Sequence, residues 1–291
     1  MKVLVTGAAG MLGREVVRQL AESGGHVCAH DRVQPDGPPA DETFLGDLRD
    51  PALIERLVDG MDAVVHAAAL PAPTAGTPDE VFTINVNGTW RVLDTAARAG
   101  VRRLVYVSSL SALGLAWSRV DRSPTEIPVT EEHPYLAEDV YGLSKRAGEL
   151  IAETTARRYG GDGMSVLSLR FPFIGSGARL RSHLDWVHQD PGHDRRGLWA
   201  WLHTADAARA VLAALDRAPA GYHLVNVTAP DTTALQPTRE LLRRYHPDTP
   251  VTEVPEGFGT PYSLSRSRDL LGFTAEERWR AAPDSEGTST P

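Results

Sequence analysis

Short apolar runs alternate with amphipathic stretches along the first 170 residues of the chain. The amphipathic stretches have the 3.6-residue period of helices, whereas runs such as AVVHAAAL and RLVYVSS are continuously apolar. Continuous apolar runs are typical of parallel strands, because helices cover both faces of a parallel sheet. The alternation therefore predicts an α/β fold built on a doubly wound parallel sheet with right-handed crossovers.

The pattern assigns strands and helices in turn to this part of the chain. Strands are expected at residues 2–6, 26–30, 62–66, 103–108 and 164–170. Helices are expected at residues 11–22, 51–59, 79–99 and 140–159. The segments 33–43 and 71–78 are rich in Pro and Gly and are expected to be loops.

The pattern changes after residue 170, because residues 171–200 are polar and show no clear period. We expect residues 1–170 to form the main domain, with a helix at 204–217 and a strand at 222–227 returning to it as part of 204–228. The remaining segments, 171–203 and 229–280, are expected to form a small, partly interleaved C-terminal cap that binds substrate. The tail 281–291 is low in apolar residues and is predicted to be disordered.

Composition excludes several classes of protein. The formal net charge is −8 and no basic stripe is present, which argues against nucleic-acid binding. No apolar run approaches the length of a membrane-spanning helix, and the first residues do not resemble a signal peptide. Cys28 is the single cysteine, so an internal disulfide and a site with several cysteines are excluded. We therefore expect a cytoplasmic protein with no nucleic-acid or membrane partner.

A glycine-rich turn stands between the first expected strand and the first expected helix. Gly7 permits the tight turn, Gly10 lets the backbone approach a pyrophosphate, and Gly13 allows close packing of helix on strand. The first N–H groups of the helix, around Met11 and Leu12, are free to bind phosphate. This context predicts a Rossmann dinucleotide-binding domain.

An acidic residue ends the second expected strand. Asp31 can accept hydrogen bonds from both adenosine ribose hydroxyls and would repel a 2′-phosphate, so NAD is favoured over NADP. The neighbouring Arg32 keeps NADP open as an alternative, because a guanidinium accommodates a phosphate. In the GDL segment, Asp47 is expected to face the adenine edge and Leu48 to pack on the adenine ring.

Tyr141 and Lys145 lie four residues apart on an expected helix and therefore share one face of it. A nearby ammonium stabilises a phenolate and lowers the pKa of the tyrosine, which makes it a better acid–base group. The ammonium can also bind the nicotinamide ribose. A serine-rich segment, VSSLS at 107–111, ends the fourth expected strand and can supply a hydroxyl to the substrate.

Taken together, these segments resemble the extended short-chain dehydrogenases/reductases of the NAD-dependent epimerase/dehydratase family. The resemblance covers roughly residues 1–230 and rests on TGAAGMLG, GDLRD, VVHAAA, NVNGT, YVSSLSALG, YGLSK, LRFPFIG and LHTADAARA. It implies that Ser109 is the catalytic hydroxyl, Tyr141 the acid–base group and Lys145 its partner.

The resemblance also implies further contacts for each ligand. Backbone at His66, Ala67 and Ala68, together with Asn85, Pro172 and Phe173, would line the cofactor. Substrate would be bound by Ser109, Ser111, Tyr141, Phe173 and Arg179. No metal site is expected, because His66 and His203 lack companion ligands at suitable spacing. Related proteins often pair through the helices at 79–99 and 140–159, so we expect a homodimer.

Three departures from the family pattern concern the substrate. Leu110 and Ser111 stand where dehydratases carry an acidic pair, which argues against water elimination. Phe173 and Trp199 stand where nucleotide-sugar enzymes carry an Asn and an Arg for the diphosphate. Aromatic rings at these positions could instead stack on a sugar. Other arginines of the 171–200 segment could form an anion site: Arg179, Arg181, Arg195 and Arg196.

The compact layout is similar to that of uronate dehydrogenases, which oxidise free sugar acids with NAD. We therefore predict an NAD-dependent oxidoreductase that transfers hydride to or from a secondary alcohol or carbonyl of a sugar-like or sugar-acid substrate. A nucleotide-sugar 4-epimerase is the alternative enzyme. A non-catalytic dinucleotide sensor is an alternative of another class, although a sensor has no need of the Ser109, Tyr141 and Lys145 set.

Overall fold

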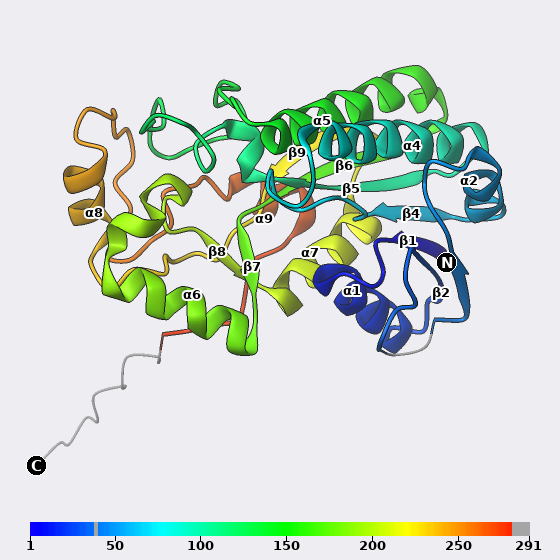
Figure 1. Ribbon diagram of the computed structural model, residues 1–291, viewed down its shortest axis with the longest axis horizontal. Coiled ribbons are helices and arrows are strands. Elements are labelled where there is room, and N and C mark those ends of the chain that lie inside the picture. The colour runs from blue at the N-terminus through cyan, green and yellow to red at the C-terminus, as the bar shows by residue number, and fades with distance from the viewer. Residues whose placement is uncertain (38–39, 281–291) are drawn as a thin grey trace, which may run out of the picture.

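The computed structural model describes residues 1–37 and 40–280, so the predicted disordered tail, 281–291, lies outside the described residues. A seven-stranded parallel sheet forms the centre, in the order β3-β2-β1-β4-β5-β6-β9 (Figure 1). Its strands are β1 (Lys2–Thr6), β2 (His26–Asp31), β3 (Glu42–Leu45), β4 (Ala63–His66), β5 (Arg103–Ser109), β6 (Ser165–Phe171) and β9 (Gly221–Asn226). The predicted doubly wound parallel sheet is confirmed.

Helices cover both faces of the sheet (Figure 1). One face is covered by α1 (Met11–Glu22) and α7 (Thr204–Arg217), the other by α2 (Pro51–Val58), α4 (Gly88–Arg98) and α5 (Val140–Tyr159). Successive strand residues point to opposite faces, so the β1 residues Val3 and Val5 enter the first core cluster while Leu4 enters the second. This alternation explains why the strands are apolar throughout.

The helix expected at 79–99 is interrupted, which corrects the sequence prediction. It consists of α3 (Pro78–Phe82), a π-helical turn at Thr83–Asn87, and α4. The π turn directs Asn85 inward, where its side chain binds the backbone of Leu70 and the hydroxyl of Ser144. Side-chain periodicity does not reveal a single π turn, because the pattern on either side remains helical.

Residues 171–200 are regular, contrary to the sequence prediction. They form β7 (Phe173–Gly175), α6 (Gly177–Gln189) and a 3₁₀ segment (Pro191–Gly197), and β7 pairs with β8 (Trp201–His203). Only Leu180 and Val187 of α6 are buried, so its apolar stripe is too narrow to stand out from the polar residues around it. The strand β3 was also missed, because it is four residues long and alternates in burial.

Between β9 and residue 280 lie two short helices, α8 (Thr238–Tyr245) and α9 (Ser265–Leu271). Isolated bridges join this part of the chain to the loop after β5, at Ile127–Val251 and Val129–Tyr262. How these elements divide into a dinucleotide domain and a cap stays a prediction. Within residues 1–37 and 40–280, no helix is long and apolar enough to cross a membrane.

Candidate active site

A cavity of about 1040 Å³ opens between the carboxyl ends of the central strands and the segment that follows β6. The sheet side contributes predicted residues: Gly7, Gly10, Met11, Leu12, Gly13, Ala67, Ser109, Ser111, Tyr141 and Lys145. The other side contributes Pro172, Phe173, Arg179, His183, Trp186, Asp194, Arg195 and Arg196. The glycine turn, the tyrosine–lysine helix and three of the four arginines expected from residues 171–200 therefore face one space, whereas Arg181 does not line it.

The glycine turn leaves no room for side chains. Gly7 has a φ of 77°, and a Cβ there would lie 2.6 Å from the backbone nitrogen of Ala68. A Cβ on Gly13 would lie 2.0 Å from the carbonyl oxygen of Gly7. Helix α1 begins at Met11 after Gly10, which offers no side-chain cap, so N–H groups of its first turn are left for an anion. This cradle fits a pyrophosphate.

Asp31 lies at the end of β2, against the glycine turn. Its carboxylate accepts hydrogen bonds from the backbone N–H of Ala9, at 2.9 Å, and of Arg32, at 2.6 Å. Asp47 is paired with Arg49 at 2.7 Å, and this ion pair lowers the pKa of the carboxyl. Leu48 packs against the core instead of standing free. Asp31, Arg32, Asp47 and Leu48 do not line the cavity.

Tyr141 and Lys145 come from the first two turns of α5. The Asp139 carboxylate caps the helix by accepting the N–H of Gly142 at 2.8 Å, which fixes where the helix begins. The Lys145 ammonium donates to the Val107 carbonyl at 2.8 Å and lies 5.8 Å from the centroid of the Tyr141 ring. Both side chains are buried at the floor of the cavity.

Burial dominates the electrostatics of this pair. It raises the pKa of Tyr141 to about 12, and the Ser109 hydroxyl opposes that shift. It lowers the pKa of Lys145 to about 8, and the Glu149 carboxylate opposes that shift. The Lys145 ammonium was expected to lower the pKa of Tyr141, but burial raises it instead. Tyr141 therefore carries its proton at neutral pH.

Two adjacent serines at the end of β5 have different environments. The Ser108 hydroxyl donates to the Glu149 carboxylate at 2.7 Å, and Glu149 also accepts two hydrogen bonds from the buried Arg170 guanidinium. Ser109 is half-buried on the cavity wall, and its hydroxyl accepts the N–H of Ser111 at 3.1 Å. Both serines line the cavity, but the Ser108 hydroxyl is already bound to the Glu149–Arg170 ion pair.

His66 and Asn85 are buried away from the cavity lining. The His66 ring contacts the hydroxyls of Thr6, at 2.8 Å, and Thr89, at 3.1 Å. Burial lowers the pKa of His66 to about 3, so the ring is neutral. Asn85 joins the backbone at Leu70 to α5 and supports the wall from behind.

Phe173 lines the cavity as expected, but its aromatic and acidic neighbours His183, Trp186 and Asp194 were not predicted from the sequence. The His183 ring stacks on Phe173, with 3.9 Å between centroids, and its Nε2 lies 3.5 Å from an oxygen of Asp194. Burial raises the pKa of the Asp194 carboxyl. Trp186 stands beside His183, at 5.8 Å between centroids. No motif signals these three residues, because His183 and Trp186 lie on α6, whose periodicity is weak, and Asp194 lies in the 3₁₀ segment that follows.

Two tryptophans that the sequence offered for sugar stacking are fully buried in the core. Trp199 donates its indole N–H to the Pro191 carbonyl at 2.6 Å, and Trp201 donates its own to Asp231 at 3.0 Å. Arg195 and Arg196 do line the cavity, and both pair with the exposed Asp121. Trp199 stands at the position where a diphosphate-binding arginine was looked for, and it is a core residue.

Comparison with known proteins adds three findings. A model described as "NAD dependent epimerase/dehydratase family" matches residues 3–228. The chain is 29% identical to a UDP-glucose 4-epimerase of Streptomyces lividans, over 77% of this chain and 74% of that protein. It is 30% identical to a uronate dehydrogenase of Pseudomonas putida, over 65% of this chain and 67% of that protein.

A solved structure shows the same fold. The structure of MoeE5 in complex with UDP-glucuronic acid and NAD has a TM-score of 0.72 and 25% identity, and the match covers 96% of this chain and 95% of that chain. The similarity thus extends past the sheet and through the segments that close the cavity.

Proposed function

The chain belongs to the NAD dependent epimerase/dehydratase family, and from that premise we propose that it is an NAD-dependent oxidoreductase acting on a small sugar or sugar acid. It would transfer hydride to or from a secondary alcohol or carbonyl carbon of the substrate. The observation that carries the proposal is that one cavity joins the glycine turn, Ser109, Tyr141 and Lys145, while Trp199 fills the position of the diphosphate arginine.

NAD is the proposed cofactor, with NADP as the alternative. The turn from Gly7 to Gly13 would hold the pyrophosphate, and Asp31 would accept the adenosine ribose hydroxyls. Bound NAD would supply or accept the hydride. Asp31 already accepts two backbone N–H groups, which fixes its carboxylate beside the turn and leaves lone pairs for the ribose.

The proton chemistry is assigned to Tyr141. Its hydroxyl is protonated at neutral pH and can donate to a carbonyl oxygen of the substrate, or take a proton in the reverse direction. Ser109 would hold the same substrate oxygen, since Ser108 is already bound to Glu149. Lys145 would bind the nicotinamide ribose and keep a positive charge beneath the tyrosine.

The polar groups on the cavity wall favour a small polyol or sugar acid. Arg179 provides a cation whose guanidinium also lies 4.8 Å from the centre of the Phe173 ring. Asp194 and the imidazole of His183 can hydrogen-bond sugar hydroxyls. A carboxylate on the substrate would be matched by Arg179, because a guanidinium binds a carboxylate through charge-assisted hydrogen bonds.

The test is a turnover assay that follows NADH absorbance with purified protein. D-glucuronate, D-galacturonate, L-arabinose and UDP-glucose are each supplied with NAD, and again with NADP. NADH formation with a free sugar or sugar acid, lost in Tyr141→Phe, supports the proposal. Interconversion of UDP-glucose and UDP-galactose without net formation of NADH would contradict the proposal and assign the protein as the epimerase.

The nucleotide-sugar 4-epimerase remains the second candidate, and one observation favours it. Arg179, Arg195 and Arg196 all line the cavity. Three guanidiniums could bind a diphosphate even without the arginine that Trp199 replaces. The ion pairs of Arg195 and Arg196 with Asp121 weigh against this use, because those hydrogen bonds would have to break.

A homodimer formed through α4 and α5 completes the proposal. Large apolar side chains are exposed on these two helices at Trp90, Leu143 and Leu150. Burying them against a second copy would remove apolar surface from water. Light scattering on the purified protein should give a molar mass twice that of the chain. In Leu150→Arg the measured mass should fall toward that of the monomer.

A further inference from the structure

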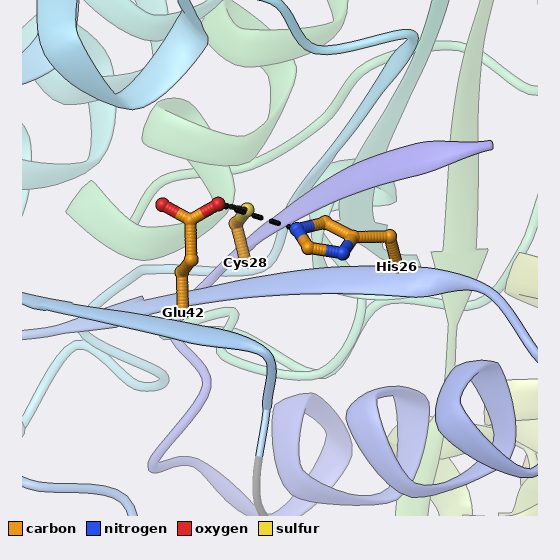
Figure 2. A group of neighbouring side chains, drawn as sticks. All are labelled: His26, Cys28 and Glu42. Carbon is orange, nitrogen blue, oxygen red and sulfur yellow. Dashed lines mark hydrogen bonds and ion pairs between the residues drawn. The ribbon is translucent and has the colours of Figure 1, made fainter.

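Three side chains with metal-binding atoms meet at the amino-terminal ends of β2 and β3, away from the cavity (Figure 2). His26 and Cys28 stand two residues apart on β2, so their side chains lie on one face of the sheet. Glu42 is the β3 residue that pairs with Cys28. The cluster therefore arises from strand pairing, which explains why the sequence analysis expected no metal site.

The spacing of the donor atoms suits a tetrahedral ion. Glu42 Oε1 lies 3.2 Å from His26 Nε2 and 3.7 Å from Cys28 Sγ, and the three donor atoms lie within 4.8 Å of one another. Zinc–ligand bonds of about 2.0–2.3 Å place neighbouring ligand atoms of a tetrahedron roughly 3.3–3.7 Å apart. Small rotations of the His26 and Glu42 side chains would bring both onto one ion beside the buried Cys28 sulfur.

The surroundings also match a cation site. An Asp41 carboxylate oxygen lies 3.7 Å from the other ring nitrogen of His26 and is fixed by the N–H of Val27 at 2.7 Å. A carboxylate behind a histidine ligand orients the ring and raises its basicity. The Lys2 ammonium lies 3.0 Å from Glu42 Oε1, so a positive charge already pairs with this carboxylate and a metal ion would compete with it.

We propose that His26, Cys28 and Glu42 bind a divalent transition-metal ion of the zinc type, with the fourth position left to solvent. As the sulfur–metal bond forms, the Cys28 thiol releases its proton to water and Lys2 moves away from Glu42. Because a thiolate is the ligand, binding competes with protonation of the thiol and tightens as the pH rises. The ion would join the edge strand β3 to β2.

The test uses the full chain, reduced and treated with a chelator, and titrated with Co²⁺. One Co²⁺ per chain is expected, with thiolate-to-cobalt absorption in the near ultraviolet and the intense visible bands of tetrahedral cobalt. Zn²⁺ should displace it. His26→Ala and Glu42→Gln alter exposed side chains and should each weaken binding at least tenfold. His223→Ala, which changes a histidine elsewhere, should bind as the wild type does.

Two further measurements separate a built site from a simple thiol adduct. Lys2→Met should tighten Co²⁺ binding several-fold, because it removes the competing ammonium. Zn²⁺ should raise the Tm of the wild type and not that of His26→Ala, since an ion that binds only the folded state stabilises it. The proposal is overturned if no thiolate band appears, or if the band survives unchanged in both His26→Ala and Glu42→Gln.

Discussion

The two sides of the cavity differ in how their residues are positioned. On the sheet side, Gly7, Gly13 and the first turn of α1 act through the backbone, and Tyr141 and Lys145 follow from one helix start. On the other side, the wall is assembled from side chains on α6 and the 3₁₀ segment, such as His183 and Asp194. The first kind of site leaves a local pattern in the sequence and the second does not.

This difference explains why the cofactor and the type of chemistry are easier to read from the sequence than the substrate. A backbone cradle requires glycine at fixed spacing, because a Cβ at Gly7 or Gly13 would collide with other backbone atoms. A sugar-binding wall requires only that some polar and aromatic groups converge, and many sequences satisfy that.

The largest effect is expected on the sheet side. Tyr141→Phe removes the proton donor and keeps the ring, so kcat should fall by roughly 10²–10⁴-fold. The affinity for NAD, measured by fluorescence titration, should be unchanged. Tyr135→Phe alters an exposed tyrosine outside the cavity and should keep full activity. Wild-type rates in Tyr141→Phe would refute its assignment as the acid–base group.

Asp31→Ala should narrow the preference for NAD over NADP. Loss of a charge-assisted pair of hydrogen bonds to the ribose costs about 1.5–3 kcal/mol, or roughly 10–150-fold in NAD affinity. Asp36→Ala removes an exposed carboxylate from the loop after β2 and serves as the control. If the native protein prefers NADP, Arg32 becomes the specificity residue instead.

Lys145 should give the protein a distinct pH dependence of stability. Because its folded pKa is about 8 and its ordinary value is 10.5, the unfolded chain binds more protons between these values. The free energy of unfolding should therefore rise with pH in this window, by up to about 1.4 kcal/mol per pH unit from this group. Urea unfolding at pH 7.5, 8.5 and 9.5 should show a steeper rise for wild type than for Lys145→Met. If the free energy of unfolding rises equally with pH in both proteins, the lowered pKa of Lys145 is contradicted.

On the opposite side, Arg179→Met should raise KM for a sugar acid by about tenfold and change KM for a neutral sugar less. Arg181→Met is the matched control, since Arg181 lies on the same helix and outside the cavity lining. Equal changes in KM for acidic and neutral sugars would remove Arg179 from the carboxylate site.

The smallest effect is expected from nucleotides. UDP, dTDP and GDP should compete weakly or not at all with the substrate, because Trp199 is buried where a diphosphate arginine would stand. Inhibition kinetics at saturating NAD would measure this. Low-micromolar inhibition by UDP would show that Arg179, Arg195 and Arg196 form a diphosphate site, and would favour the epimerase.

The sequence predicted helices best where a cap or a wide apolar stripe marks them. Helix α5 begins at Val140, after the cap Asp139, and α7 spans Thr204–Arg217, both as expected. The parallel sheet follows from the continuous apolar runs. The π turn, β3 and α6 were not predicted, because each depends on packing against distant segments more than on its own pattern.

The same limit applies to the candidate site. Tyr141 and Lys145 were found because their spacing puts them on one face of α5, and Ser109 because it ends β5 and matches the family pattern. His183 and Asp194 meet across two elements of a segment with little periodicity, and His26, Cys28 and Glu42 meet across two strands, one of them unpredicted. Contacts between side chains of different segments can be predicted only when the fold is already known.

The late position of β9 in the chain has a consequence for biosynthesis. Strand β6 is completed at Phe171, but its outer neighbour β9 begins only at Gly221. While the ribosome makes the residues between them, the hydrogen-bonding edge of β6 has no strand to pair with, and an open edge invites pairing with other nascent chains. Emergence of residues 221–226 is thus the step that pairs this edge of β6, and truncation before it should give aggregates.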